Sequence, residues 1–99
     1  MIRGTTPTLQ FTMPFDTSIL SCLYLTLAQR GATILEKCLD DCDCNGAEVT
    51  CKLTQADTLK INAKHPVDFQ VRAKTVNDDA LASQIVSLSA GRILKDGEI

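Results

Sequence analysis

Cysteines and aspartates alternate over one short run, where side chains of metal-binding type come closest together. The thiols are Cys38, Cys42 and Cys44, and aspartates occupy positions 40, 41 and 43 between them. Structural zinc usually takes four ligands from two closely spaced pairs, often Cys-x-x-Cys, whereas these thiols are separated by three residues and by one. The aspartates do not reproduce the oxygen positions of a calcium-binding loop either. The three cysteines are therefore only weak metal candidates, and we expect a solvated hairpin loop without metal.

Other side chains capable of chemistry are scattered along the sequence. His65 is the single histidine and lies before a proline in a polar stretch, with no recognisable nucleophile paired to it. Arg3, Arg72 and Arg92 could converge on a small anionic ligand, because guanidinium groups bind carboxylate and phosphate bidentately. The glycine pattern of a phosphate-cradling loop is absent. We therefore predict that the chain is not an enzyme and needs no cofactor.

Length and composition set the class of protein. The 99 residues predict one domain, residues 1–99, in which residues 91–99 form a C-terminal tail. A formal charge of -2 argues against a nucleic acid polymer as partner, and no apolar run reaches the roughly 18 residues that a membrane span needs. Five cysteines cannot all pair within the chain, so we expect free thiols in a reducing compartment, the cytosol.

Alternation of apolar and polar residues predicts short strands separated by turn signals. The expected strands are Thr8–Met13, Ile19–Gln29, Ala32–Cys38, Ala47–Thr54, Val67–Thr75 and Ala80–Ala90. Residues 19–29 also fit helical spacing, and we favour a strand because Arg30-Gly31 and the apolar run after it indicate a hairpin. Asn45-Gly46 predicts a second hairpin.

The polar stretch from Leu53 to Lys60 organises this pattern, because it separates two alternating runs. We expect residues 55–59 to form one helical turn with Thr54 as its cap and Asp57 near its start. Leu53 and Leu59 would then fix the two ends of a crossing between sheets. The sequence thus predicts an all-β, antiparallel two-sheet sandwich, immunoglobulin-like in the broad sense, with six or seven strands and one short helical turn.

Three parts of the chain resemble a known group of phage proteins. They are residues 3–8 with Phe11 and residues 14–16, residues 53–59 without position 56, and residues 94–97. Together they resemble small proteins encoded in prophages and phages of Gram-positive gut bacteria, which are similar in turn to the N-terminal domain of phage baseplate upper proteins. The resemblance spans almost the whole chain and implies a β-sandwich module of a phage tail locus. The cysteines of residues 38–44 depart from that pattern.

Two hypotheses of different classes follow from the resemblance and from the missing catalytic set. The first is a non-enzymatic phage structural or assembly module, located in the bacterial host cytoplasm and in the virion, that binds virion proteins or itself as a homo-oligomer. The second is a small phage-encoded binder that sequesters a nucleotide-derived host defence signal between protomers, with the scattered arginines holding the anionic ligand. A metal-stabilised module is a third possibility, and it predicts stoichiometric zinc.

Overall fold

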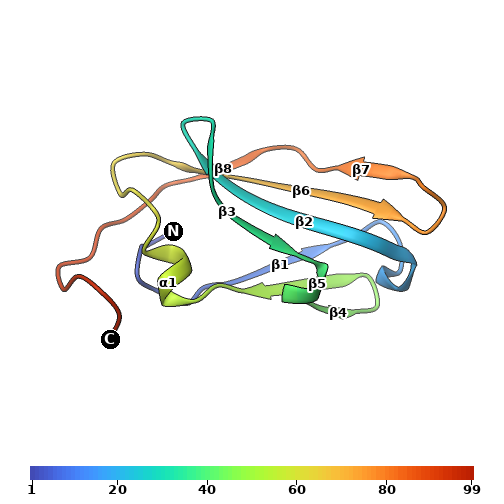
Figure 1. The fold of residues 1–99 in the computed structure, drawn as a ribbon, viewed down its shortest axis with the longest axis horizontal. Coiled ribbons are helices and arrows are strands. Elements are labelled where there is room, and N and C mark those ends of the chain that lie inside the picture. The colour runs from blue at the N-terminus through green and yellow to red at the C-terminus, as the bar shows by residue number, and fades with distance from the viewer.

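Two antiparallel sheets stack in a sandwich-like arrangement (Figure 1). The computed structural model describes residues 1–99. The first sheet has three strands in the order β1 (Thr8–Thr12), β5 (Glu48–Lys52) and β4 (Asp43–Asn45). The second has five: β3 (Ala32–Cys38), β2 (Leu20–Gln29) and β6 (Val67–Thr75) in that order, followed by β7 (Ala80–Ala82) and β8 (Val86–Leu88), which both pair with β6. The predicted two-sheet, antiparallel architecture is confirmed at this level.

The longest strand, β2, settles the ambiguity between helix and strand over residues 19–29. Leu23, Leu25 and Leu27 are buried at alternate positions, as the period of a strand requires. The chain then reverses at Arg30-Gly31, where both residues have positive φ (52° and 78°), and continues into β3. Two residues of positive φ match the right-handed twist of a two-residue hairpin. The predicted bounds of β3 and β6 are also correct.

The predicted continuous strand Ala80–Ala90 is wrong, because the chain forms two short strands there. Ser83 N–H donates to the carbonyl oxygen of Val71 at 2.8 Å, and Val71 N–H donates to the Ser83 hydroxyl at 2.9 Å in place of a backbone carbonyl. The hydroxyl interrupts the ladder, and the pairing shifts by one residue between Arg72↔Ala82 and Phe69↔Val86. With β4 the strands number eight, not six or seven.

The connection from β5 to β6 crosses between the sheets through α1 (Gln55–Thr58), as the sequence predicts. The Thr54 hydroxyl accepts from Asp57 N–H at 3.1 Å, and the Asp57 carboxylate accepts from Thr54 N–H at 2.9 Å. These two reciprocal hydrogen bonds make a capping box. Leu53 is completely buried, whereas Leu59 is only half-buried, so the first residue anchors the crossing more strongly than the second.

The buried Asp57 also joins α1 to the neighbouring sheet. The Lys37 ammonium lies 3.0 Å from its carboxylate, and both side chains are largely buried. Burial raises the pKa of Asp57, but the hydrogen bonds from Thr54 N–H and Lys37 outweigh it. The pKa therefore lies below its ordinary value of 3.8, and the carboxylate is ionised in the folded protein.

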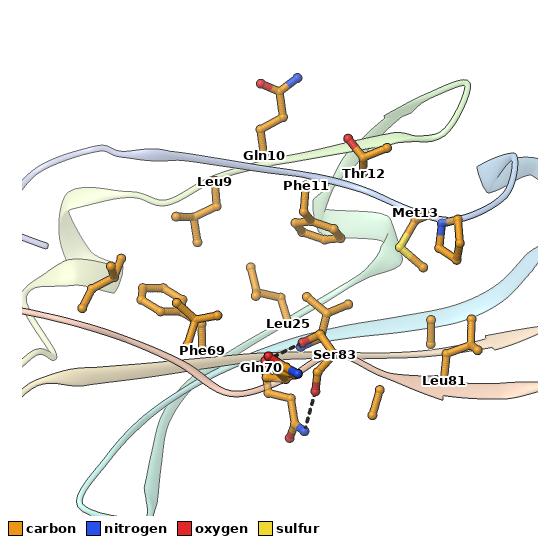
Figure 2. A pocket seen from close by; sticks show the side chains of 17 residues that line it. Leu9, Gln10, Phe11, Thr12, Met13, Leu25, Phe69, Gln70, Leu81 and Ser83 are labelled. Atoms are coloured by element: carbon orange, nitrogen blue, oxygen red, sulfur yellow. Dashed lines mark hydrogen bonds between the residues drawn. The ribbon is translucent and has the colours of Figure 1, made fainter.

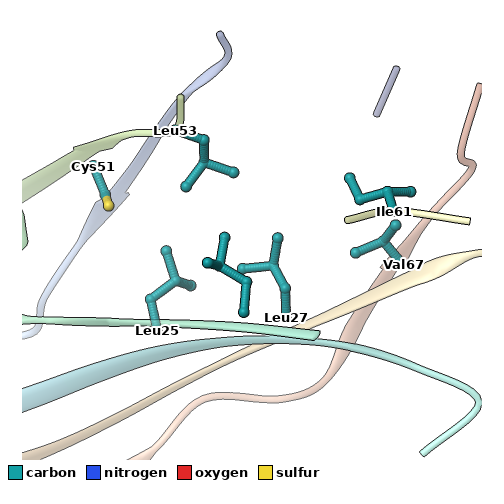
Figure 3. Close-up of a cluster of buried hydrophobic side chains, with 7 residues drawn as sticks. Leu25, Leu27, Cys51, Leu53, Ile61 and Val67 are labelled. Atoms are coloured by element: carbon teal, nitrogen blue, oxygen red, sulfur yellow. The ribbon is translucent and has the colours of Figure 1, made fainter. Parts of the chain in front are cut away.

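Two clusters of buried side chains show which strands face each other across the sandwich. In the first, Leu25 and Leu27 of β2 pack against Cys51 and Leu53 of the β5 segment (Figure 3). In the second, Leu23 of β2 packs with Val49 of β5. Beside these clusters, Leu9 and Phe11 of β1 line the same hollow between the sheets as Phe69 and Val71 of β6. Thus β5 lies over β2 and β1 lies over β6, while β7 and β8 have no strand opposite them.

Two 3-10 turns complete the connections. Residues Thr17–Ile19 form η1, where the Asp16 carboxylate accepts from Ser18 N–H at 2.9 Å. Residues Leu39–Asp41 form η2, between β3 and β4. None of the helices is long and apolar enough to cross a membrane.

Candidate functional site

An apolar cleft opens between the sheets on the side where β1 and the β7–β8 pair form the edges. Its volume is about 650 Å³, and 11 of its 17 lining residues are hydrophobic. None of the 17 is charged. Figure 2 shows Leu9 and Phe11 of β1 pointing across the space towards Phe69 and Leu25 of the other layer, while Gln10 and Thr12 point away. Met13, the residue after β1, also lines the cleft. The cleft is larger than the hollow of about 230 Å³ beside Cys22.

The upper rim of the cleft is the unpaired edge of β1. Leu53 N–H donates to the Pro7 carbonyl oxygen at 2.9 Å, and Met13 N–H donates to the Ala47 carbonyl oxygen at 2.7 Å. Odd-numbered residues of this strand therefore direct their backbone groups at β5. In an antiparallel ladder the alternate residues direct theirs to the opposite side. The backbone N–H and C=O groups at positions 8, 10 and 12 thus face a free edge.

The lower rim is the outer edge of β7 and β8, and it exposes large apolar side chains. Ile85 is 65% exposed and Val86 is 54% exposed, and Leu81 and Leu88 are also exposed. Val86 and Leu88 nevertheless line the cleft together with Leu81. Exposed apolar surface of this extent next to an unpaired strand is typical of an interaction surface.

Charge is distributed unevenly between the two sides of the sandwich. The chain has ten basic and twelve acidic residues, yet none lies within residues 4–15 or 80–91, the two segments that form the rims. The edge strands on the opposite side carry charges: Glu36 and Lys37 on β3, and Asp43 on β4. Charged side chains protect an edge strand from pairing with another chain. Only the edges beside the cleft lack this protection.

The arginines predicted to bind an anion do not line the cleft. Arg3 donates to the carbonyl oxygens of Ile61 and Leu59 at 3.1 and 3.0 Å and forms an ion pair with Asp96 at 2.9 Å. The hydrogen bond from Arg3 lowers the pKa of Asp96. This guanidinium therefore holds together the N-terminal segment, the α1 region and the C-terminal segment.

The other two arginines lie elsewhere on the surface. Arg72 is exposed on the outer face of β6, in register with Tyr24 of β2 and Ala82 of β7. Arg92 is exposed and follows Gly91, which forms a bridge with Ile2. Neither the apolar cleft nor the smaller hollow beside Cys22 has an arginine in its lining.

The three candidate cysteines do not form a metal site. The Cys38 thiol contacts the Asp41 carboxylate at 3.3 Å, the Cys42 thiol points at the Cys38 carbonyl oxygen at 3.5 Å, and Cys44 is exposed on β4. No three His, Cys, Asp or Glu side chains are arranged to hold a metal ion. Burial, followed by the contact with Cys51, raises the pKa of Cys42 to about 12, which disfavours the thiolate that a metal would need.

Comparison with protein-family models, with curated proteins and with solved structures finds no match. The cleft was missed at the level of sequence because its lining comes from strands that are far apart in the chain. The sequence contains one signal for the rims, the uncharged segments 4–15 and 80–91, but residues 17–29, which include the central strand β2, are uncharged as well.

Proposed function

We propose that this protein is a non-enzymatic structural or assembly module of a phage, which binds virion proteins or further copies of itself through the apolar cleft. The observation that carries the proposal is the cleft of about 650 Å³ between two unpaired, uncharged strand edges. The assignment to a phage is based on the resemblance to phage proteins described above. The same proposal includes an immunoglobulin-like topology for the sandwich. It also includes synthesis in the host cytoplasm and incorporation into the virion.

The physical reason is the cost of leaving such a surface in water. Burial of apolar area stabilises a complex by about 25 cal/mol per Å², and monomers seldom leave a large apolar patch uncovered. The cores of protein interfaces lack charged residues and are rich in aromatic residues and Met. The lining matches that composition, with Phe11, Met13 and Phe69 among its members.

Mass spectrometry of purified phage particles, combined with the native mass of the purified protein, tests the proposal. The wild-type chain should be present in particles or should self-associate, and Val86→Asp should abolish the association. Val76→Asp is the matched control, because Val76 is 64% exposed but does not line the cleft. A wild-type protein that is absent from particles and stays at 10.7 kDa would overturn the proposal.

The competing hypothesis is that the protein sequesters a nucleotide-derived signal. Its anionic ligand would need cationic partners, and none of the lining residues of the cleft is charged. Thermal-shift measurements with cyclic and ADP-ribose-type nucleotides test it directly. A clear rise in melting temperature that Arg72→Ala or Arg92→Ala removes would favour sequestration over assembly.

A further inference from the structure

The two sheets end at different places on the open side of the sandwich. Because β5 lies over β2 and β1 lies over β6, the five-stranded sheet extends beyond the three-stranded sheet by the width of one strand position, which β7 and β8 share. The inner face of β7 and β8 therefore has no strand above it. One strand placed beside β1 would occupy that position and cover Leu81, Val86 and Leu88.

The strand directions determine what could pair there. Along β1 the chain passes from the first buried cluster, which Leu9 contacts, to the second, which Phe11 contacts. Along β6 it passes from Val67 in the first cluster to Ala73 in the second, so β1 and β6 run in the same direction. Since β7 and β8 are antiparallel to β6, they run opposite to β1. The arrows of β1, β6 and β7 in Figure 1 show these directions.

We propose that the missing strand is supplied by a second copy of this chain, in a two-fold symmetric dimer. The axis runs along the strands, midway between the layers, so that each β7–β8 edge lies antiparallel beside β1 of the other copy. Each layer then becomes one continuous antiparallel sheet: β4, β5 and β1 of one copy, followed by β7–β8, β6, β2 and β3 of the other. This dimer rests on the proposed assembly function and specifies its partner.

A second copy fits because the overhang is complementary to itself. In each layer, the strand position that is empty beside β1 of one copy is filled by β7 and β8 of the other copy. One symmetric interface therefore fills both clefts. Pairing of β1 with its own symmetry mate would instead bring two overhanging β7–β8 edges into the same space. The C-terminal segment of a neighbour is a poor occupant, because residues 92–98 carry four charges and the cleft lining carries none.

The backbone groups at the two edges also match. Thr8, Gln10 and Thr12 present unpaired N–H and C=O groups, and the alternation of the β6 ladder directs those of Ala80 and Ala82 outward in the same way. Because both rims are uncharged, their approach brings no like charges together. Val86 and Leu88 of β8 then face the same residues of the other copy across the space between the two layers.

Native mass spectrometry and light scattering over a range of protein concentrations test the dimer. We expect a shift from 10.7 kDa to twice that mass with rising concentration. Gln10→Pro should restore the monomer mass, because it removes an edge N–H that no bond within the chain uses and proline is tolerated at sheet edges. Val86→Asp should do the same, and Val76→Asp should remain dimeric. Circular dichroism checks that each variant is folded.

Hydrogen exchange of the wild-type protein distinguishes this dimer from any other. The amides of Thr8, Gln10 and Thr12 should exchange rapidly in dilute solution and become protected as the dimer forms. A dimer that leaves them unprotected, or that survives both Gln10→Pro and Val86→Asp, overturns this arrangement while self-association stands. A monomer at all concentrations that is still found in phage particles overturns the dimer and leaves the assembly function intact.

Discussion

Leu53 is the residue whose truncation best tests the arrangement of the two layers. Its side chain is fully buried between the sheets, in a cluster with Leu25, Leu27, Ile61 and Val67 (Figure 3). It also stands at the start of the crossing between the sheets. If the sandwich is arranged as described, Leu53→Ala leaves a cavity that strands from both layers would have to fill.

The expected cost follows from the buried carbons that are lost. Leu→Ala removes three carbons, and at about 0.8 kcal/mol for each the transfer cost alone is roughly 2.4 kcal/mol. The unrelaxed cavity brings measured Leu→Ala costs to about 2–5 kcal/mol. Small domains have total stabilities of about 5–15 kcal/mol, so this change removes a large part of the stability. For a domain of this size the melting temperature should fall by about 10 °C or more.

Urea unfolding at one fixed protein concentration measures the effect, since association also changes apparent stability. The matched control is Leu94→Ala, because Leu94 is 95% exposed and its truncation should cost no more than about 0.5 kcal/mol. Leu59→Ala should fall between the two, because Leu59 is half-buried. Equal midpoints for Leu53→Ala and Leu94→Ala would refute the packing of the two sheets.

Three further predictions concern local features. Asp57→Asn should remove an acid-dependent part of the stability: the folded-state pKa of Asp57 is lowered, so its contribution is present above the unfolded value of about 3.9 and is lost as the pH falls through the folded value. Urea midpoints of wild type and variant should then converge at low pH. Gly4→Ala should destabilise more than Gly97→Ala, measured by thermal melting, because both glycines have positive φ but only at Gly4 does an added Cβ meet a side chain, at 2.8 Å. Alkylation followed by mass spectrometry should modify the exposed Cys44 long before Cys42, whose pKa is raised to about 12.

Local patterns predicted the elements whose partners lie nearby in the chain. The hairpin at Arg30-Gly31 and the capping box of α1 each depend on a few adjacent residues, and both form as expected. The strand Val67–Thr75 has correct bounds because apolar and polar residues alternate regularly from Val67 to Lys74. In each case the feature depends on residues that are close together in the chain, so a local sequence pattern is enough to predict it.

The break between β7 and β8 depends on a contact that no local pattern contains. Ser83 ends the ladder because its hydroxyl takes the N–H of Val71, twelve residues earlier. A single serine within an alternating run does not by itself indicate where a strand ends. The cleft was unpredictable for the same reason, since it requires the strand order of both sheets. The predicted convergence of Arg3, Arg72 and Arg92 on an anion is not supported, because the three side chains lie at separate places on the protein.

The cysteine and aspartate run helps to explain why the protein is open on one side only. It links β3 of the five-stranded sheet to β4 of the three-stranded sheet through η2, so the chain itself closes that side. The half-buried Leu39 and Cys42 pack against the core there. The aspartates at positions 40, 41 and 43 are exposed to water at edges that need no partner. Charge and chain connection thus disfavour pairing at the edges of β3 and β4, whereas the edges of β1 and β8, at which the proposed dimer pairs, have neither.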